Sequence, residues 1–139
     1  MKFSILVPVY NEEKTVINIL ERLNQTKVDK VEYEIIVIND GSTDNTKDLL
    51  ENNKKLFSIL INNERNSGKG FSVKEGLKVA SGDYIIFQDA DLEYDPIEFN
   101  KFVKVCENFD ADIVIGSRFN FSEYTRSHNI LNKFGNNLW

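Results

Sequence analysis

The fold class is indicated most clearly by residues 84–91, which are Tyr84-Ile85-Ile86-Phe87-Gln88-Asp89-Ala90-Asp91. Four consecutive apolar residues have the length and composition of a buried strand, and two aspartates follow where that strand ends. In an extended chain, residues two apart point to the same side, so Asp89, Asp91 and Glu93 could converge on one small volume. Because three carboxylates repel one another, such a group requires a cation, and Mg²⁺ or Mn²⁺ shared with a phosphate suits these hard oxygen ligands. The alternative is an ordinary solvated loop, in which Asp-x-Asp also occurs.

Similar apolar runs recur along the chain and alternate with segments of helical periodicity. Strand-sized runs occupy Phe3–Val9, Tyr33–Ile38, Phe57–Ile61, Tyr84–Phe87 and, more weakly, Ile113–Ile115. Between them, apolar residues at helical spacing are Val16, Ile19, Leu20 and Leu23; Leu49 and Leu50; Val73, Leu77 and Ala80; and Phe99, Phe102, Val103 and Cys106. Strands that alternate with helices predict an α/β domain with a mostly parallel sheet flanked by helices.

Composition restricts the domain count and the partners. The 139 residues fit one domain, 1–139, which is long enough for a core but short for an enzyme with separate donor and acceptor subsites. The 22 acidic and 17 basic residues give a net charge of −5, which argues against nucleic acid as the main partner. Cys106 is the single cysteine, which excludes an internal disulfide and a multi-cysteine metal site. The apolar stretch ending at Pro8 resembles neither a signal peptide nor a membrane span, so we expect a cytoplasmic protein.

Polar residues collect after three of the predicted strands, where ligands of open parallel sheets bind. These clusters are Pro8, Tyr10, Asn11 and Glu12; Asn39–Asp44; and Asp89–Asp91. Helix capping explains Ser42 or Thr43 but not Asp40, whose carboxylate could accept hydrogen bonds from the N–H edge of uracil or guanine.

Glu12 could serve the same base pocket as Asp40. For Pro8 and Tyr10, a strand terminator and a half-buried aromatic residue are as good an interpretation as a wall on which a base stacks.

The segment Gly68-Lys69-Gly70 is not a known nucleotide loop. A P-loop requires Ser or Thr directly after its lysine, where this chain has Gly70. A dinucleotide fingerprint requires a third glycine, where this chain has Val73, and it follows the first strand of its fold. The glycines could allow close approach to a nucleotide at a helix start, with Lys69 available to a phosphate or ribose. A tight loop-to-helix junction that binds nothing is the alternative.

Taken together, these segments resemble the family 2 glycosyltransferases, which have the Rossmann-like nucleotide-diphospho-sugar transferase fold called GT-A. The resemblance is carried by Ser4–Glu12, Val37–Asp44, Asn66–Gly70, Gly82–Tyr84, Phe87–Leu92 and Gly116–Phe119, which occur in the expected order over most of the chain. The Asp-Ala-Asp and Gly-Ser-Arg-Phe forms are most similar to the polyprenyl-phosphate (dolichyl-phosphate-type) mannosyl- and glucosyltransferases.

The resemblance implies roles for single residues. The nucleotide-sugar would be bound by Pro8, Tyr10, Glu12, Asp40, Lys69, Asp89, Ala90 and Asp91. The ligands of the divalent metal, Mg²⁺ or Mn²⁺, would be Asp89, Asp91 and Glu93, although related enzymes also carry an amide at the third position. Arg118 matches an arginine near the acceptor phosphate, and Arg126 would extend that basic patch. Catalysis would then rest on Asp89, Asp91 and Arg118.

The activity implied is transfer of a hexose from a donor of the GDP-mannose or UDP-glucose type. The acceptor would be a polyprenyl phosphate, and the reaction a metal-assisted displacement with inversion at the anomeric carbon. The metal would neutralise the charge on the departing diphosphate. A lipid acceptor implies that the protein works at the cytoplasmic face of a membrane as a peripheral protein.

In the resembled enzymes the catalytic domain continues beyond the position of Trp139, so we expect the nucleotide-sugar-binding portion of a longer domain. Residues 124–139 have the pattern of a helix opening, and its apolar face could support a homo-oligomer, touch a membrane or belong to an unfinished core. Two alternatives are a non-catalytic nucleotide-sugar-binding module and a sugar-phosphate nucleotidyltransferase, although no Gly-rich loop follows the first strand. A dehalogenase-type phosphatase would have Asp-x-Asp after the first strand, not the fourth.

Overall fold

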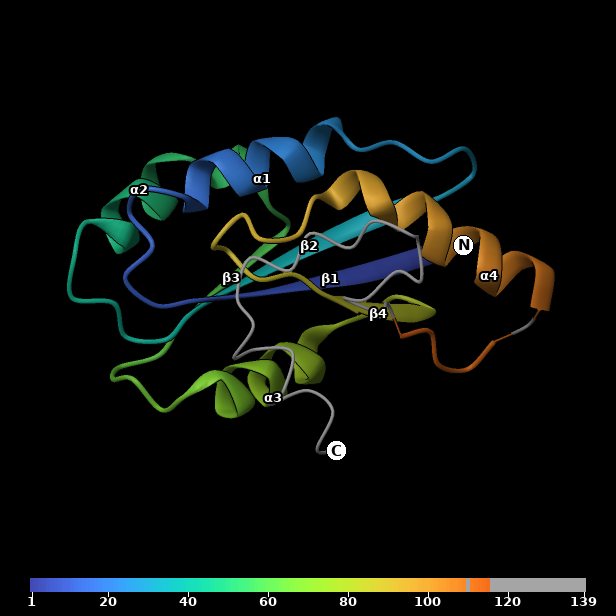
Figure 1. The fold of residues 1–139 in the computed structure, drawn as a ribbon. Helices are drawn as coiled ribbons and strands as arrows, with labels where there is room; N and C mark the ends of the chain where they lie inside the picture. The colour runs from blue at the N-terminus through green and yellow to red at the C-terminus, as the bar shows by residue number, and fades with distance from the viewer. Residues whose placement is uncertain (110, 116–139) are drawn as a thin grey trace, which may run out of the picture. The chain divides into compact units, whose positions relative to one another are not determined.

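The computed structural model describes residues 1–109 and 111–115. Its described part is built on four parallel strands in the order β3-β2-β1-β4 (Figure 1). The strands are β1 (Lys2–Val9), β2 (Glu32–Asn39), β3 (Ile59–Asn62) and β4 (Tyr84–Phe87). The helices are α1 (Val16–Gln25), α2 (Thr46–Asn52), α3 (Lys69–Val79) and α4 (Phe99–Phe109), with short 3₁₀ turns η1 (Lys54–Leu56) and η2 (Pro96–Glu98). The predicted α/β fold with a parallel sheet is confirmed.

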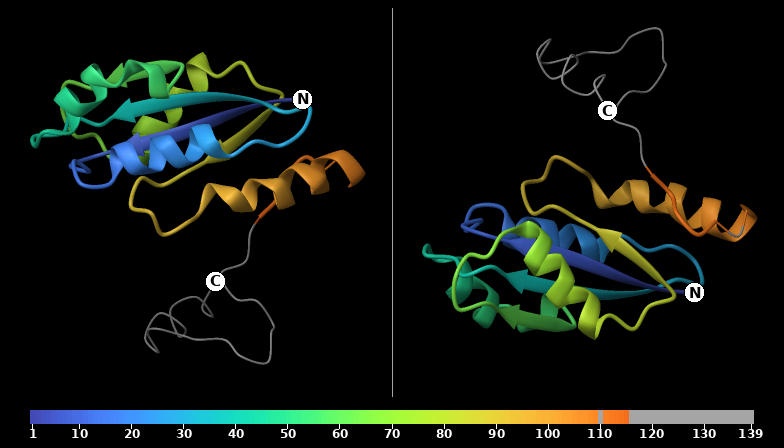
Figure 2. Two further views of the ribbon diagram at one scale, coloured as in Figure 1. Left: turned by 90° about the horizontal axis from the view of Figure 1, so that it is seen from above. Right: turned by 90° about the horizontal axis from the view of Figure 1, so that it is seen from below.

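The strand order has a reversal at β1. This strand pairs with β2 on one side and with β4 on the other, so the chain moves outward from β1 to β3 and then returns across the sheet. Helices α1 and α2 cover one face of the sheet and α3 covers the other (Figures 1 and 2). In open parallel sheets, such a reversal leaves a crevice beyond the carboxyl ends of the strands. The loops that follow β1 and β4 border this crevice.

Apolar side chains fill both faces of the sheet. On the face of α1, the buried cluster includes Ile5, Val7 and Val37 from the strands and Ile19 and Leu20 from the helix. On the face of α3, the buried residues are Leu6, Ile36 and Ile38, with Val73 and Ala80 packed against them. Neighbouring residues of one strand therefore enter opposite cores, as the two-residue period of a strand requires. Because both faces are covered, β1 and β2 are apolar along most of their length.

Two details of the sequence prediction are wrong. Ile113–Ile115 forms no strand: Ile113 and Ile115 are 79% and 86% exposed, and none of the described strands pairs with this segment. Three residues without a hydrogen-bonded neighbour cannot hold a strand conformation. Leu77, predicted to face the core, is 46% exposed because α3 turns its small residues Ser72 and Gly76 to the sheet instead. A glycine and a serine let the helix approach the strands more closely than leucine would.

None of the helices in the described residues has the length and apolar character that crossing a membrane requires.

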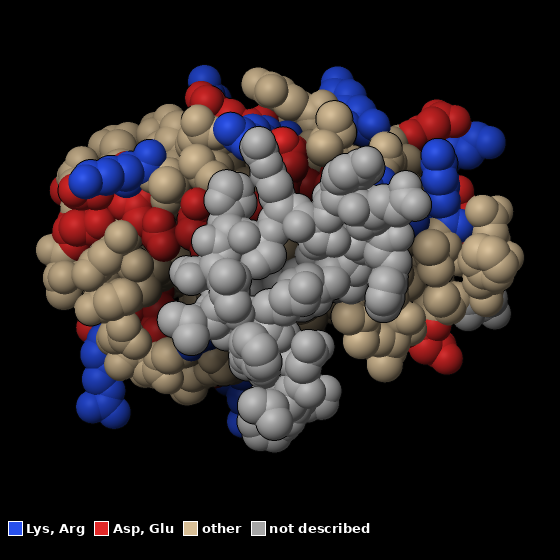
Figure 3. All heavy atoms as spheres, viewed as in Figure 1, with Lys and Arg blue, Asp and Glu red and all other residues tan. Residues whose placement is uncertain are grey.

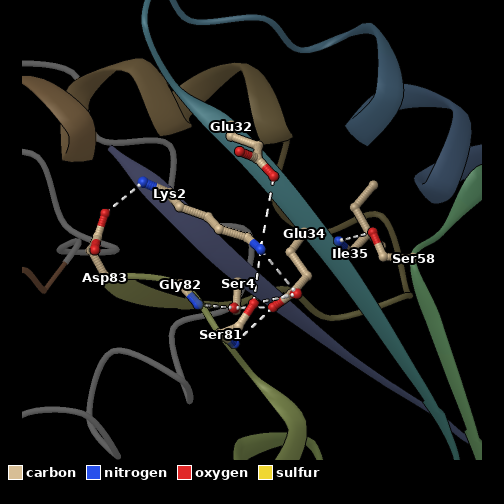
Figure 4. A network of polar contacts seen from close by, with 9 residues as sticks. All are labelled: Lys2, Ser4, Glu32, Glu34, Ile35, Ser58, Ser81, Gly82 and Asp83. Atoms are coloured by element: carbon tan, nitrogen blue, oxygen red, sulfur yellow. Dashed lines mark hydrogen bonds and ion pairs between the residues drawn. The ribbon is translucent and has the colours of Figure 1, made fainter.

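The partly buried carboxylate of Glu34 joins the beginnings of β1, β2 and β4 (Figure 4). Glu34 Oε2 accepts hydrogen bonds from Ser4 Oγ (2.6 Å) and the Ser81 N–H (2.9 Å), while its Oε1 accepts from Ser81 Oγ (2.6 Å) and Lys2 Nζ (3.3 Å). Ser4 Oγ in turn accepts from the Gly82 N–H (2.9 Å). A Cβ at Gly82 would lie 2.5 Å from the Ser4 backbone nitrogen, so only glycine fits. The network attaches the turn before β4 to the two central strands.

We expect the stability of the fold to decrease with falling pH in the acidic range because of Glu34. Burial raises the pKa of Glu34, but hydrogen bonds from Ser4, Ser81 and Lys2 outweigh it and lower the pKa from 4.5 to about 2. Because the folded-state pKa lies below the unfolded value, the ionised carboxylate stabilises the fold fully above the unfolded pKa, and this contribution is lost as the pH falls toward 2. Replacement of Glu34 by Gln should lower the unfolding free energy at pH 7 by about 1–3 kcal/mol.

Urea unfolding followed by circular dichroism at several pH values measures both effects. Stability should depend less on pH between 4.5 and about 2 in Glu34→Gln than in the parent protein. Glu32→Gln is the matched control, because the Glu32 side chain is 74% exposed on the same strand. Equal acid sensitivity of the parent and Glu34→Gln would contradict this role.

Candidate functional site

A pocket of ≈ 220 Å³ opens where the strands end. Its lining residues are Pro8, Val9, Tyr10, Asp40, Asn66, Gly68, Lys69, Ser72 and Asp89. They come from the end of β1, from the residues that follow β1, β2, β3 and β4, and from the beginning of α3. The pocket therefore lies at the reversal of strand order, where a sheet of this topology binds its ligand.

The residues predicted from the sequence divide into two groups. Pro8, Tyr10, Asp40, Lys69 and Asp89 line the pocket, and four further predicted residues, Glu12, Ala90, Asp91 and Glu93, do not. Arg118 and Arg126 lie outside the described residues, as do the Gly116–Phe119 segment and the expected helix opening at 124–139.

A larger hollow of ≈ 400 Å³ lies at the opposite edge of the sheet, where the strands begin. Met1, Lys2, Lys30, Val31, Glu32 and Asp83 line it. Lys2 is already engaged there by Glu34 and Glu32. Because parallel α/β sheets bind ligands at the carboxyl ends of their strands, the smaller pocket is the better candidate.

Asp40 organises the wall of the pocket. It is only 3% exposed, and its Oδ1 and Oδ2 accept hydrogen bonds from Asn63 Nδ2 and the Gly68 N–H, each at 2.7 Å. The Ser67 N–H donates to both oxygens, at 3.2 and 3.1 Å. Burial raises the pKa of Asp40, but these hydrogen bonds outweigh it and hold the pKa below its ordinary value. The ionised carboxylate thus fixes the loop that leads into α3, and its predicted contact with a base stays a prediction.

Gly41 allows the same loop to come close. Its φ is +68°, and a Cβ at this position would lie 2.4 Å from the carbonyl carbon of Arg65. A side chain at Gly41 would therefore push the 65–68 loop away from Asp40.

The loops after β1 and β2 are joined by side-chain hydrogen bonds. Asn11 has a φ of 54°, which asparagine tolerates, and its Oδ1 accepts from the Thr43 N–H (2.8 Å). Ser42 Oγ accepts from the Asn11 N–H (3.0 Å). The Glu12 N–H donates across the same junction to Thr46 Oγ1 (2.9 Å), while the Glu12 carboxylate accepts from Thr15 Oγ1 (2.6 Å). These contacts fix the position of the pocket wall, and the Glu12 side chain, bound to Thr15, does not line the pocket.

The loop after β4 is held from inside the protein. Gln88 is 2% exposed, and its Nε2 donates to the carbonyl oxygens of Asp89 (3.0 Å) and Tyr94 (3.1 Å). Ala90 is buried in the core cluster on the face of α1. With Gln88 and Ala90 both anchored, the Asp89 backbone is fixed at the edge of the pocket.

The charged groups at the pocket form an ion pair. Lys69 Nζ, from the first residue of α3, donates to Asp89 Oδ1. The side chains of Lys69 and Asp89 are 60% and 32% exposed, respectively, so the pair lies at the solvent-facing side of the pocket. Among the described residues, this is the one ion pair of which both partners line this pocket.

The predicted convergence of three carboxylates is not observed. Leu92 has a φ of 66°, so residues 91–93 are not extended, and Asp91 Oδ1 instead accepts from the Glu93 N–H (3.0 Å). Within residues 1–109 and 111–115, no group of three His, Cys, Asp or Glu side chains is arranged to hold a metal ion. The described part of the chain therefore has no preassembled three-carboxylate cluster, and the assignment of a metal to Asp89, Asp91 and Glu93 stays a prediction.

The surface around the site is acidic. On the face drawn in Figure 3, Asp and Glu side chains gather beside α2 and the loop that follows β1, with few Lys or Arg side chains among them. An anionic ligand at this edge of the sheet therefore needs a cation close to it.

Asn66 and Ser72 line the pocket without having been predicted as ligand-binding residues. Asn66 stands in one of the quoted motifs, and Ser72 lies four residues before Gly76 on the sheet-facing side of α3, a small-residue spacing that could have indicated it.

The chain belongs to glycosyl transferase family 2, whose model matches residues 4–135. The family predicted from the motifs is confirmed. The similar solved structures are glycosyltransferases with the Rossmann-like GT-A fold, which confirms the predicted fold as well.

The similar proteins include one sequence relative and two solved structures that contain a bound nucleotide or nucleotide-sugar. An undecaprenyl-phosphate 4-deoxy-4-formamido-L-arabinose transferase of Proteus mirabilis is 36% identical over 123 residues, which cover 84% of this chain and 36% of that protein. The structure of S. aureus TarS residues 1–349 in complex with UDP-GlcNAc has a TM-score of 0.65 and 34% identity, covering 77% of this chain and 32% of that one. Glucosyl-3-phosphoglycerate synthase from Mycobacterium tuberculosis, in complex with Mn²⁺, UDP and glucosyl-3-phosphoglycerate, has a TM-score of 0.61 and 26% identity, covering 75% and 39%. The chain spans half the length or less of the curated relatives it matches.

We expect Asp40→Asn to destabilise the fold by about 1–3 kcal/mol, because an amide nitrogen would face the N–H donors of Ser67 and Gly68. Urea unfolding at pH 7 measures the loss. Asp29→Asn is the control, since Asp29 is exposed and should change the unfolding free energy by less than about 0.5 kcal/mol. Unchanged stability of Asp40→Asn would show that Asp40 does not organise the loop.

Proposed function

We propose that this chain forms the donor-binding part of a glycosyltransferase that moves a hexose from a nucleotide-diphospho-sugar to polyprenyl phosphate. The observation that carries the proposal is the composition of the pocket at the reversal of strand order. An aromatic wall at Tyr10, a carboxylate-ordered loop at Asp40 and a Lys69–Asp89 pair line one pocket. A nucleoside diphosphate has parts that match each of them: a base, a ribose and two phosphates.

The donor's base would stack against Pro8 and Tyr10, and its diphosphate would lie at the beginning of α3. Tyr10 is 43% exposed, so its ring is accessible to a ligand. The first backbone N–H groups of an α-helix have no partner within the helix, and the helix dipole favours an anion there. Helix α3 has 11 residues, and its first residue is Lys69, which adds a full positive charge. Binding of UDP-GlcNAc by the S. aureus relative supports this assignment.

Asp89 and Asp91 would hold a divalent cation, Mg²⁺ or Mn²⁺, together with the donor. The chemistry of the donor set fits, because Mg²⁺ is usually bound by one or two carboxylates plus substrate phosphates and does not need a complete cage of protein ligands. When bound, the ion would act as a Lewis acid toward the departing diphosphate. The Mn²⁺ in the mycobacterial relative supports a divalent ion, and Glu93 is a third ligand only if the 91–93 turn opens.

The proposed acceptor is a lipid phosphate, as the name of the Proteus mirabilis relative suggests. A phosphate is already an anionic nucleophile, so single displacement with inversion needs no general base. Arg118 and Arg126 would pair with that phosphate, and the protein would act at the cytoplasmic face of a membrane. A second candidate is a module that binds the donor without transferring sugar, because the pocket described here contains donor-side groups alone.

We expect thermal unfolding to report donor binding. The chain is titrated with UDP, GDP, UDP-glucose and GDP-mannose, each with Mn²⁺ or with a chelator. One base should raise the midpoint in a Mn²⁺-dependent manner, since ligand at 100 times its Kd stabilises by about 2.7 kcal/mol. No shift from a cooperatively folded sample would contradict the proposed function.

Asp91→Asn should unfold at the same temperature as the parent protein but lose the Mn²⁺ dependence of the shift, since Asp91 is exposed and outside the core. Asp29→Asn is again the control. A retained Mn²⁺ dependence in Asp91→Asn would reject its assignment. Transfer of radiolabelled sugar to undecaprenyl phosphate then separates a transferase from a module that only binds.

A further inference from the structure

We propose that Lys69 couples the binding of metal and donor. Without ligand its ammonium group occupies Asp89 in place of a divalent cation, and a donor diphosphate draws it away, so that the metal and the donor bind cooperatively. This inference rests on the proposed function, because it assigns an order of events to the same pocket.

The Lys69–Asp89 pair differs from the pairs that join residues three apart in the described part of the chain. Lys54, Lys78 and Lys101 each pair with a glutamate three residues away along the chain, within a helix or a helical turn next to it. Lys69 instead pairs with Asp89, 20 residues away, from another element and across a pocket. Its contact therefore does not serve helix stability and depends on what else is present in the pocket.

The backbone on both sides of the pair is fixed. At one side, the Gly68 N–H is bound to Asp40 at 2.7 Å, which holds the beginning of α3. At the other side, Gln88 binds the Asp89 carbonyl oxygen at 3.0 Å from within the protein. The movable part is the Lys69 side chain, which is 60% exposed and carries its ammonium group on a flexible chain of four carbons. Exchange of partners thus requires rotation of one side chain and no loop movement.

The Lys69 ammonium group and a divalent cation repel each other, so binding of both at Asp89 is electrostatically unfavourable. Both are attracted by the same carboxylate, and each disfavours the other when no further anion is present. A diphosphate at the beginning of α3 adds negative charge beside Lys69, so the ammonium gains a new partner and Asp89 becomes available to the metal. By linkage, the factor by which the donor tightens metal binding equals the factor by which the metal tightens donor binding.

The test is calorimetric titration of Mn²⁺ alone into the parent protein and into Lys69→Met. We expect Lys69→Met to bind Mn²⁺ about fivefold more tightly, the upper range for release of an exposed ion pair. Lys78→Met is the matched control, because Lys78 lies on the same helix and pairs with Glu75, yet does not line the pocket. Lys69→Arg keeps the positive charge and should bind Mn²⁺ as weakly as the parent.

A second titration measures the coupling. UDP or GDP, whichever binds, should tighten Mn²⁺ binding by a larger factor in the parent protein than in Lys69→Met. Equal Mn²⁺ affinities of the parent and Lys69→Met, without nucleotide, would overturn the inference. A parent protein that binds neither nucleotide would contradict the proposed function instead, because the titration with Mn²⁺ alone does not depend on a donor. Urea unfolding of Lys69→Met verifies that the variant is folded, and Lys69→Gln serves as a second neutral variant.

Discussion

The pairing of β1 with both β2 and β4 is the constraint on which the rest of the structure depends. Because all pairs are parallel, the carboxyl ends of these strands lie at one edge of the sheet. Residues from three distant segments, Tyr10, Asp40 and Asp89, line one pocket for this reason. The Glu34 network at the opposite edge supports the arrangement by attaching the turn before β4 to β1 and β2.

Regular elements and the location of the site could be predicted from the sequence, since both follow from local periodicity and the topology of parallel sheets. The strand ends at Val9 and Phe87 indicated where polar residues would meet. The conformation of the 89–93 segment could not be predicted, because alternation assumes an extended chain and Leu92 adopts a positive φ. The missing strand at Ile113–Ile115 has a related cause: an apolar run forms a strand only beside a partner, and periodicity does not report whether one exists.

The exposure of Leu77 shows a third limit of prediction from sequence. Helix α3 was expected to face the core with Val73, Leu77 and Ala80, yet Leu77 is 46% exposed, and Ser72 and Gly76 face the sheet. Hydrophobicity alone cannot distinguish a helix that packs through large side chains from one that packs closely through small ones. Close packing has a consequence for the site, because it brings the first turn of α3, with Lys69, to the rim of the pocket.

Asp40 and Asp89 follow equivalent strands, yet their surroundings imply different roles. Asp40 is 3% exposed and its oxygens are occupied by backbone and amide donors that cannot leave without unfolding the loop. Asp89 has a side chain that is 32% exposed and is neutralised by Lys69, a flexible group that can exchange partners. A carboxylate saturated by fixed donors contributes to structure, whereas one balanced by a movable cation is prepared to accept another cation. In a protein of net charge −5, the proposed anionic donor and its metal would enter together at the second kind of carboxylate.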